Sequence, residues 1–477
     1  MVNFKKSRLV FTSIGLFILL FSEEPILSQS DQGYPRLMQG SMLGAVTENS
    51  IKIWVRTSGP FPVSIVYGTD RNLQNSQETE PMRTEKSNDY VAVIPVKGLV
   101  PETRYFYKIK VNGVDDKYLG RYSPFEFKTA PLPRAKTNFR IAIGSCARYQ
   151  YDRTQPIWRA VALTAPDLFF WLGDNIYGDA LDPDILREEY RRQRDVQSLQ
   201  PLLRTIPQLA IWDDHDFGLN DHDVTNPVKE EALQVFKQYW ANPSYGLPEV
   251  PAVFFRYSYG AVDFFFLDVR YHRDPNRQAD STGKTMLGKP QLLWLKSELK
   301  NSRAIFKVLI SGSGWSTAKG PGGDSWASFL YERNAIFDFI RDNNITGVVL
   351  LSGDTHVGEL NVIPWSAHGG YDFYELVSSP LAQPPADSWI ARRPERRIRP
   401  VYFVSSNFGI IDFIFDDSAK LIFQLKDDVG RNVWQPFELK AQELVNGVQS
   451  WPDKVDPLEN IRHEKYEKGE GYYEHNE

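Results

Sequence analysis

The chain has 477 residues, of which 42% are hydrophobic, 13% aromatic and 24% charged. This length exceeds what one hydrophobic core usually serves, so two domains are expected, and the composition excludes a chain that is disordered throughout. The formal net charge of −5 gives no long-range attraction to polyanions, so neither a nucleic-acid-binding surface nor an anionic membrane partner is expected.

Residues 1–30 predict a cleaved export signal. Three basic side chains within the first eight residues precede an apolar run over 9–21, and Ser28 and Ser30 follow in a small-x-small arrangement, as in secretory signal peptides. The alternative is a membrane anchor, but about 13 residues at roughly 1.5 Å each span only some 20 Å of a hydrocarbon core about 30 Å thick. We therefore expect a secreted or periplasmic protein without a stable membrane anchor after signal cleavage.

Residues 37–130 predict a β-sandwich. Short alternating segments such as 50–56, 63–67 and 91–96 are separated by Gly, Pro, Asn and Asp, a spacing typical of packed antiparallel sheets. The stretch around Tyr105 resembles the tyrosine corner of fibronectin type III and related sandwiches, in which a Tyr hydroxyl ties a strand to the preceding loop. Tyr105 is therefore interpreted as a structural residue.

A proline-containing linker at 131–137 leads into a larger domain, predicted over 138–448. Strand-like runs alternate there with helical periodicity, so this domain is expected to be α/β. Amphipathic helices are predicted over 228–240, 289–300 and 333–342. Later strand-like runs, expected to complete a second sheet, lie at 373–377, 401–404, 410–415 and 421–425. The tail over 449–477 is polar and lacks a period, which predicts a flexible, solvated segment.

Ionisable residues follow the predicted strands of the larger domain. The post-strand segments are Gly144-Ser145-Cys146, Gly173-Asp174-Asn175-Ile176-Tyr177, Asp213-Asp214-His215-Asp216, Asp268-Val269-Arg270 and Ser352-Gly353-Asp354-Thr355-His356. In layered α/β folds, ligands bind at the carboxyl ends of strands, because the loops there converge. Converging carboxylates repel one another and resist desolvation, so bound cations are the simplest explanation.

The candidate ligands mix several donor types: carboxylates (Asp174, Asp214, Asp354), imidazoles (His215, His356), the phenol of Tyr177 and the thiol of Cys146. Such a mixture suits a first-row transition ion beside a harder divalent ion, and neither an all-oxygen calcium cage nor a closed zinc site.

Each residue also has a structural interpretation. Asp174 could cap a turn, and Cys146 could be a buried hydrophobe. Asp213 and Asp214 cannot both point the same way from an extended segment, so one is expected to bind metal while the other braces the loop, and Asp214 is taken as the ligand.

Two further side chains have open roles. His215 could be a core histidine or a neighbour of the ligands, although only seven histidines occur and two of them, His215 and His356, lie in these loops. Arg270 could be an ion-pair residue or could hold a phosphate oxygen, and the sequence does not separate these.

The motifs, in this order, resemble those of the PhoD-like alkaline phosphatases. Besides the post-strand segments, the resemblance rests on Trp212 before Asp213 and on Gln291-Leu292-Leu293-Trp294-Leu295. It implies a fibronectin III-like β-sandwich followed by a four-layer α/β/β/α metallophosphatase domain. It also implies a dinuclear centre of Fe³⁺ and Ca²⁺, with other divalent ions as alternatives. The implied metal ligands are Cys146, Asp174, Tyr177, Asp354 and His356, with Asp174 bridging and Asp214 as a further ligand.

This interpretation predicts an exported, metal-dependent phosphoric-ester hydrolase, acting on phosphomonoesters or phosphodiesters in small molecules or polymers. A metal-bridged hydroxide would attack phosphorus, His215 would orient the phosphate or protonate the leaving oxygen, and Arg270 or Arg148 would hold phosphoryl oxygens. A metal-dependent sulfatase or carboxylesterase could use the same centre. The non-enzymatic alternative is a surface adhesion or glycan-binding protein whose sandwich is the binding module.

Overall fold

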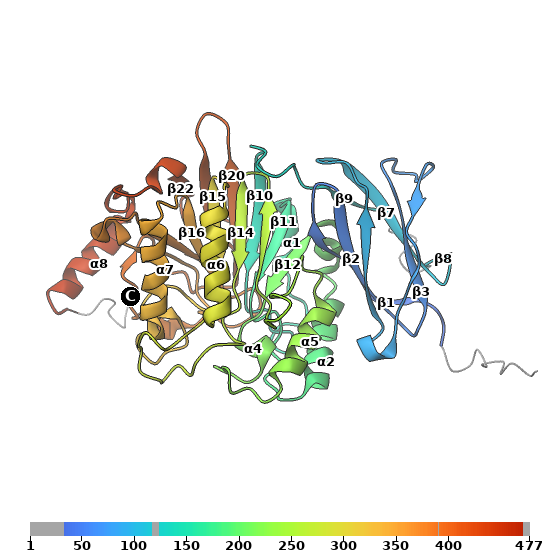
Figure 1. The fold of residues 1–477 in the computed structure, drawn as a ribbon, viewed down its shortest axis with the longest axis horizontal. Coiled ribbons are helices and arrows are strands. Elements are labelled where there is room, and N and C mark those ends of the chain that lie inside the picture. Colours follow the sequence, from blue (N-terminus) through green and yellow to red (C-terminus); the bar gives the residue numbers. More distant parts are fainter. Residues whose placement is uncertain (1–32, 117–123, 390, 471–477) are drawn as a thin grey trace, which may run out of the picture.

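The structure is a computed structural model that describes residues 33–116, 124–389 and 391–470. Strands β1 to β9 form a separate block beside a larger mixed α/β body (Figure 1). The predicted export signal lies outside the described residues, as does the end of the predicted tail. Among the described helices, none combines the length and the hydropathy that a membrane crossing requires.

The first block contains two antiparallel sheets. One has the order β1 (Leu37–Val46), β2 (Ser50–Thr57) and β6 (Val91–Lys97). The other is centred on β3 (Pro62–Gly68) and β7 (Arg104–Val111), with the short strands β4 (Gln77–Glu78), β5 (Met82–Arg83), β8 (Val114–Asp115) and β9 (Phe125–Lys128). The backbone N–H of Val100 donates to the Tyr105 hydroxyl at 3.0 Å, so the predicted tie between strand and preceding loop is confirmed.

The larger body contains two sheets. The six-stranded sheet has the order β12 (Gln208–Ile211), β11 (Leu168–Leu172), β10 (Phe139–Gly144), β20 (Asn407–Ile414), β21 (Lys420–Asp427) and β22 (Phe437–Lys440). The seven-stranded sheet has the order β13 (Phe255–Tyr259), β14 (Val262–Phe266), β15 (Phe306–Ile310), β16 (Val348–Ser352), β18 (Phe373–Val377), β17 (Glu359–Ile363) and β19 (Arg396–Arg397). Strands β10 to β12 are mutually parallel, as are β14 to β16.

Aromatic side chains join the two sheets face to face. The ring of Phe170 in β11 lies 4.9 Å from that of Phe264 and 5.0 Å from that of Phe266, both in β14. Helices cover the outer faces (Figure 1). The six-stranded sheet is covered by α1 (Ile157–Leu163), α2 (Pro183–Asp195), α3 (Gln200–Thr205) and α5 (Lys229–Tyr239), and the seven-stranded sheet by α6 (Lys289–Asn301) and α7 (Leu330–Asp342).

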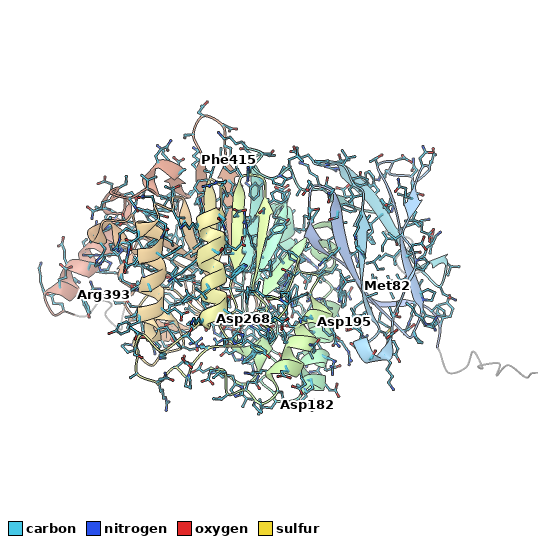
Figure 2. All side chains as sticks on the ribbon, in the orientation of Figure 1. Met82, Asp182, Asp195, Asp268, Arg393 and Phe415 are labelled. Carbon is cyan, nitrogen blue, oxygen red and sulfur yellow. The ribbon has the colours of Figure 1, made fainter. Side chains whose placement is uncertain are left out.

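The carboxyl ends of the parallel strands lie at the same edge of the sheets. Figure 2 shows Asp268, which follows β14, in the lower part of the molecule and Phe415, which follows β20, near the top. Asp268 fixes the edge, because its carboxylate accepts hydrogen bonds from the indole of Trp212 and from the backbone of Arg270, each at 2.9 Å. Gln291 of α6 bonds both the N–H and the carbonyl of Asp268, so this helix is tied to the same edge.

The predicted helices agree with α5, α6 and α7, which begin and end within a few residues of the expected bounds. The later strands are distributed differently from the prediction. Strand β18 joins the seven-stranded sheet, but β20 and β21 complete the six-stranded one.

The predicted strand over 401–404 is wrong. Only Tyr402 pairs there, in a single bridge with Gly358. Val401 is buried but Val404 is 76% exposed, so this run is a loop that leads from one sheet to the other and is only partly packed against the core.

The described part of the tail also differs from the prediction, because it contains helix α8 (Pro457–Glu467). Asp456 caps this helix by accepting from the Leu458 N–H, and Pro457 starts it. The side chains of Glu459 and His463 are buried. A helix is usually predicted from apolar residues that repeat on its buried face. Because polar residues occupy the buried positions of α8, the sequence shows no such pattern there.

Candidate metal centre

The predicted ligands stand on sharply turned backbone directly after the strands. Cys146 follows β10, Asp174 follows β11, and Asp354 and His356 follow β16, with φ of +61°, +50°, +70° and +55°. Left-handed backbone costs a non-glycine residue roughly 1–2 kcal/mol, and such positions cluster at functional sites. At Gly173, where φ is +95°, an added Cβ would lie 2.7 Å from the Cβ of Asp213, so this turn requires glycine.

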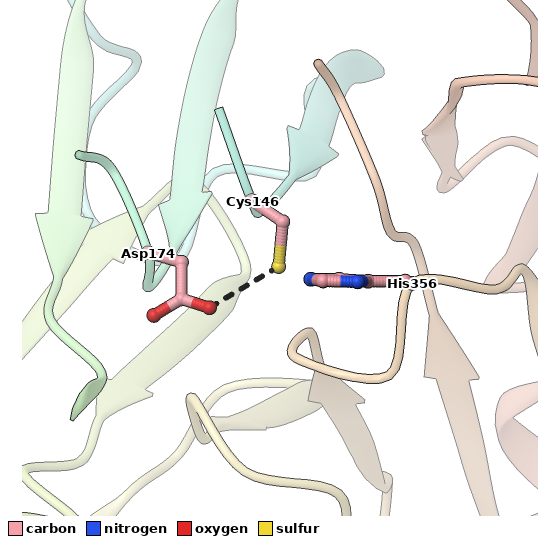
Figure 3. A group of neighbouring side chains, drawn as sticks. All are labelled: Cys146, Asp174 and His356. Atoms are coloured by element: carbon pink, nitrogen blue, oxygen red, sulfur yellow. Dashed lines mark hydrogen bonds between the residues drawn. The ribbon is translucent and has the colours of Figure 1, made fainter. Parts of the chain in front are cut away.

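Three of these side chains form one candidate metal-binding group. Ligand atoms of Cys146, Asp174 and His356 lie within 4.8 Å of one another. Figure 3 shows them converging from separate loops, with the Cys146 Sγ 3.3 Å from the Asp174 Oδ2. The Tyr177 hydroxyl completes the group, at 2.9 Å from the His356 Nε2 and 3.5 Å from the Asp174 Oδ2.

A second group shares Asp174. Ligand atoms of Asp174, Asp214 and His215 also lie within 4.8 Å of one another. Asp214 begins α4 (Asp214–Phe217), and its Oδ2 accepts from the backbone N–H of Asp221 at 2.7 Å. Asp213 forms an ion pair with Arg270, whose guanidinium also lies 3.7 Å from the Asp214 Oδ1. The assignment of Asp214 as the metal ligand of the two stays a prediction.

Several buried carboxylate oxygens have no hydrogen-bond partner among the described residues: Asp174 Oδ1, Asp213 Oδ2 and Asp214 Oδ1. An unpaired buried acceptor costs free energy, and for an ionised carboxylate the cost is large. A cation would remove this cost, and thiol, phenol, imidazole and carboxylate donors together suit a transition metal ion. The residues therefore fit a metal centre.

Burial controls the protonation of the first group. It raises the pKa of the Cys146 thiol to about 11 and raises the pKa of Asp174 well above its ordinary value. Burial also lowers the pKa of His356 to about 4, which keeps the imidazole neutral, the form that binds metals. A bound cation favours the thiolate and the carboxylate, so metal binding and proton release are coupled at this site.

The pKa of His215 is shifted in the opposite direction to that of His356. Burial lowers its pKa, but Asp174, Asp214 and Asp179 outweigh that effect and raise the pKa to about 11. Its Nδ1 contacts the carboxylate of Asp179, and its ring lies 4.2 Å from that of Tyr177. The neighbouring carboxylates therefore favour the protonated form of this imidazole. Asp179 was not predicted from the sequence, although it lies only two residues after Tyr177.

Arg270 is fully buried, and every nitrogen of its guanidinium is used within the protein. Its partners are Asp213, Asp324, the Ser313 hydroxyl and the His222 carbonyl. The structure therefore favours the ion-pair interpretation over a phosphate contact. Arg148 differs, because its half-buried guanidinium lies over the Tyr177 ring at 5.2 Å from the centroid.

Asp354 lies in neither group that contains Asp174. Its Oδ2 forms an ion pair with the ammonium of Lys319, a residue that the sequence did not indicate. Burial raises the pKa of Asp354 to about 6, and the carboxylates of Asp354, Asp324 and Asp214 raise the pKa of Lys319 to about 12 despite burial.

A third acidic group, Asp214, Asp221 and Asp324, adjoins the second. Asp324 is paired with Arg270 and Arg273 at 2.6 Å each. The negative charge of Asp324 is therefore already balanced by the two arginines.

The comparisons with known proteins agree with this geometry. A family model described as PhoD-like phosphatase matches residues 141–400, and a model described as a domain of unknown function matches 34–119. Alkaline phosphatase D of Bacillus subtilis (strain 168) is 24% identical over 336 residues, which is 60% of this chain and 55% of the relative. The chain thus matches about half the length of this curated relative.

Two solved structures share the fold. The structure of PhoD aligns with a TM-score of 0.67 and 18% identity, over 90% of this chain and 96% of that one. Purple acid phosphatase PPD1 from yellow lupin (Lupinus luteus) seeds aligns with a TM-score of 0.58 and 14% identity, over 89% of this chain and 76% of that one.

Proposed function

The chain belongs to the PhoD-like phosphatase family, and from this premise we propose that it is a metal-dependent phosphoric-ester hydrolase. The observation that carries the proposal is the pair of candidate ligand groups that share Asp174, within the segment that the family model matches. The substrates would be phosphomonoesters or phosphodiesters, in small molecules or in polymers.

The donor types suggest which ions would bind. Cys146, Tyr177 and His356, with Asp174, would hold a transition metal ion, because thiolate and imidazole are ligands of transition metals. Fe³⁺ is the proposal, because the phenolate and carboxylate oxygens are hard anionic donors that suit this ion. Asp174, Asp214 and Asp354 would hold a harder ion, for which Ca²⁺ is the proposal. When bound, such ions act as Lewis acids and lower the pKa of water from 15.7 to about 7.

The protein's own groups would orient the substrate and move the proton. Because Asp179 contacts the Nδ1 of His215, the proton for the leaving oxygen would come from Nε2. Arg148, whose guanidinium stays half-exposed beside Tyr177, would attract phosphoryl oxygens. Arg270 would act as a positioning residue that keeps the Asp213–Asp214 segment in place.

Finer features of the protein are proposed with this function. We propose export through residues 1–30, a fibronectin III-like sandwich over 37–130 and a four-layer catalytic domain over 138–448. Amino-terminal sequencing of the mature protein would test the export signal.

Hydrolysis assays would test the activity. The purified protein should hydrolyse nitrophenyl phosphate or bis-nitrophenyl phosphate, and a strong chelator should abolish this activity until metal is restored. Asp174→Asn should lose about 10³-fold in rate together with its metal, since a metal ion contributes several kcal/mol to such transition states. Activity only on a sulfate or carboxylate ester, or full activity in Asp174→Asn, would contradict the proposal.

A further inference from the structure

A buried lysine lies next to the candidate ligands. Lys319 belongs to the loop between β15 and α7, and its ammonium forms an ion pair with the Asp354 carboxylate. The Lys319 side chain is only 7% exposed and that of Asp354 only 12%. Since buried lysines are rare unless paired, this position needs a physical reason.

The loop around Lys319 is held from both sides. Glu395 accepts a hydrogen bond from the Thr317 N–H at 3.0 Å and pairs with Arg333 of α7 at 2.7 Å. Beyond Lys319 the chain turns sharply at Gly323, where an added Cβ would lie 2.6 Å from the Lys319 carbonyl oxygen. These contacts fix the base of the side chain and thereby aim its ammonium at Asp354.

One carboxylate oxygen then has two candidate partners. Asp354 lies two residues before His356, a member of the first ligand group, yet it joins neither group that shares Asp174. Its Oδ2 contacts the ammonium of Lys319. An ammonium and a divalent ion cannot both bind this oxygen closely, because like charges in a buried site repel strongly.

We propose that Lys319 is a built-in cation of this centre, which competes with a second metal ion for Asp354. The chain would then hold one ion tightly at Cys146, Asp174 and His356, and a second ion only weakly. This inference rests on the proposed function, because it requires the first ion. If Lys319 holds Asp354 for 90–99% of the time, the apparent affinity for the second ion falls by about 10- to 100-fold.

Metal binding gives a readout that does not depend on activity. Wild-type protein and Lys319→Met would be loaded with iron, desalted and analysed for metal by mass spectrometry, and Ca²⁺ would then be titrated by calorimetry. We expect one tightly held ion in both proteins, and Ca²⁺ binding about 10- to 100-fold tighter in Lys319→Met than in wild type.

Two control variants separate charge from burial. Lys319→Arg keeps the positive charge and should bind Ca²⁺ as weakly as wild type does. Lys284 is also a buried lysine, but its ammonium bonds the carbonyls of Asn276, Gln278 and Ser328 at 2.8–2.9 Å. Lys284→Met should therefore lower thermal stability without changing Ca²⁺ affinity.

Equal Ca²⁺ affinity in wild type, Lys319→Met and Lys319→Arg would overturn the inference while leaving the proposed function intact. A Ca²⁺ affinity that rises equally in Lys284→Met would overturn it as well, since the effect would then come from loosened packing. Absence of any retained metal in all variants would instead overturn the proposed function itself.

Discussion

At the scale of single residues, the contact between His215 and Asp179 can be tested by substitution. Asp179→Asn removes the carboxylate that holds the Nδ1 of His215 but leaves the imidazole in place. We expect its rate to fall about tenfold, and that of His215→Ala by about 10²- to 10⁴-fold, the usual contribution of a general acid.

The measurement is the rate of phosphate ester hydrolysis, together with metal content. Asp184→Asn serves as the matched control, because Asp184 is an acid on α2 that is 86% exposed. Both active-centre variants should keep their metal. An Asp179→Asn rate equal to that of wild type would show that the contact does not orient His215.

The sequence predicted the members of the first candidate group better than the residues that contact the candidate ligands. Cys146, Asp174 and His356 could be found because each follows a buried strand, and strand ends converge. Lys319 could not, because it lies on a loop whose path depends on tertiary contacts such as Glu395 with Thr317. Asp179 was missed although it lies on the same loop as Asp174, because it lies farther from the strand end. Arg270 was ambiguous because an arginine after a strand can pair with either a carboxylate or a substrate.

At the scale of elements, Glu375 connects β18 to the loop that carries Lys319. Its buried carboxylate accepts from the N–H groups of Trp315 and Ser316 at 2.6 and 3.2 Å and from the Ser352 hydroxyl at 2.8 Å. Glu375→Gln turns an amide NH₂ toward these donors. We expect the free energy of unfolding to fall by about 1–3 kcal/mol, the cost of leaving a buried donor unpaired.

Denaturant unfolding measures this change. Glu438→Gln is the control, since Glu438 pairs with Lys420 on the surface and should change stability by less than about 0.5 kcal/mol. Equal stability of Glu375→Gln and wild type would mean that water or a rearranged loop replaces the lost hydrogen bonds.

Helix α8 predicts a pH dependence of stability. Burial, reinforced by Arg396, Arg393 and Arg397, lowers the pKa of His463 to about 3 from the ordinary 6.5. Below pH 6.5 the unfolded chain therefore binds a proton that the folded protein excludes. The free energy of unfolding is therefore highest, as far as His463 is concerned, above pH 6.5. It decreases as the pH falls toward 3, by up to about 1.4 kcal/mol per pH unit.

Urea unfolding at pH 7 and pH 5 would measure the effect. Relative to wild type, His463→Gln should lose less stability between these two values. Ile461→Ala changes an exposed side chain of the same helix that carries no titratable group and should keep the wild-type difference. An unchanged pH dependence in His463→Gln would contradict the prediction.

Helix α8 also shows where periodicity fails as a guide. Helices α5, α6 and α7 bury apolar stripes that repeat at helical spacing, so the sequence predicts them. The buried positions of α8 are instead Glu459 and His463. A helix that docks through polar side chains cannot be distinguished from a solvated tail by hydropathy.

At the scale of the whole molecule, Asp89 links the two-sheet block to the larger body. Its carboxylate pairs with Arg56 of β2 at 2.9 Å and with Arg191 of α2 at 2.6 Å, and the Tyr239 hydroxyl of α5 donates to it. Asp89→Asn keeps the shape and tolerates the local φ of +50°. It should lower the free energy of unfolding by about 1–3 kcal/mol, because charge-assisted hydrogen bonds are lost.

Thermal unfolding and limited proteolysis would test this link, with Asp115→Asn as the control, since Asp115 pairs with Lys108 on the surface. Cleavage near residues 131–137 should become faster in Asp89→Asn only. Identical digestion of both variants would show that apolar contacts alone hold the two parts together.

The order of the two parts along the chain could be predicted from the sequence, because a change in periodicity marks the passage from one to the other. The allocation of strands to sheets could not. Strands β18 and β20 are similar apolar runs, but they belong to different sheets. The sheet that each strand joins depends on which sheet has an unpaired edge next to it in space, and the sequence pattern does not contain that information.

The pairing of β10 with β20 has a consequence for synthesis. Ile143 aligns with Gly409 across this ladder. In a nascent chain that contains β10 to β12 but not yet β20, the β10 edge of the sheet is therefore unpaired. That edge stays open while residues 212–406 emerge from the ribosome, and open edges template aggregation. A fragment that ends at residue 400, where the family match ends, is therefore expected to be insoluble. During synthesis, chaperones that bind unfolded chains would have to protect the incomplete polypeptide from aggregation.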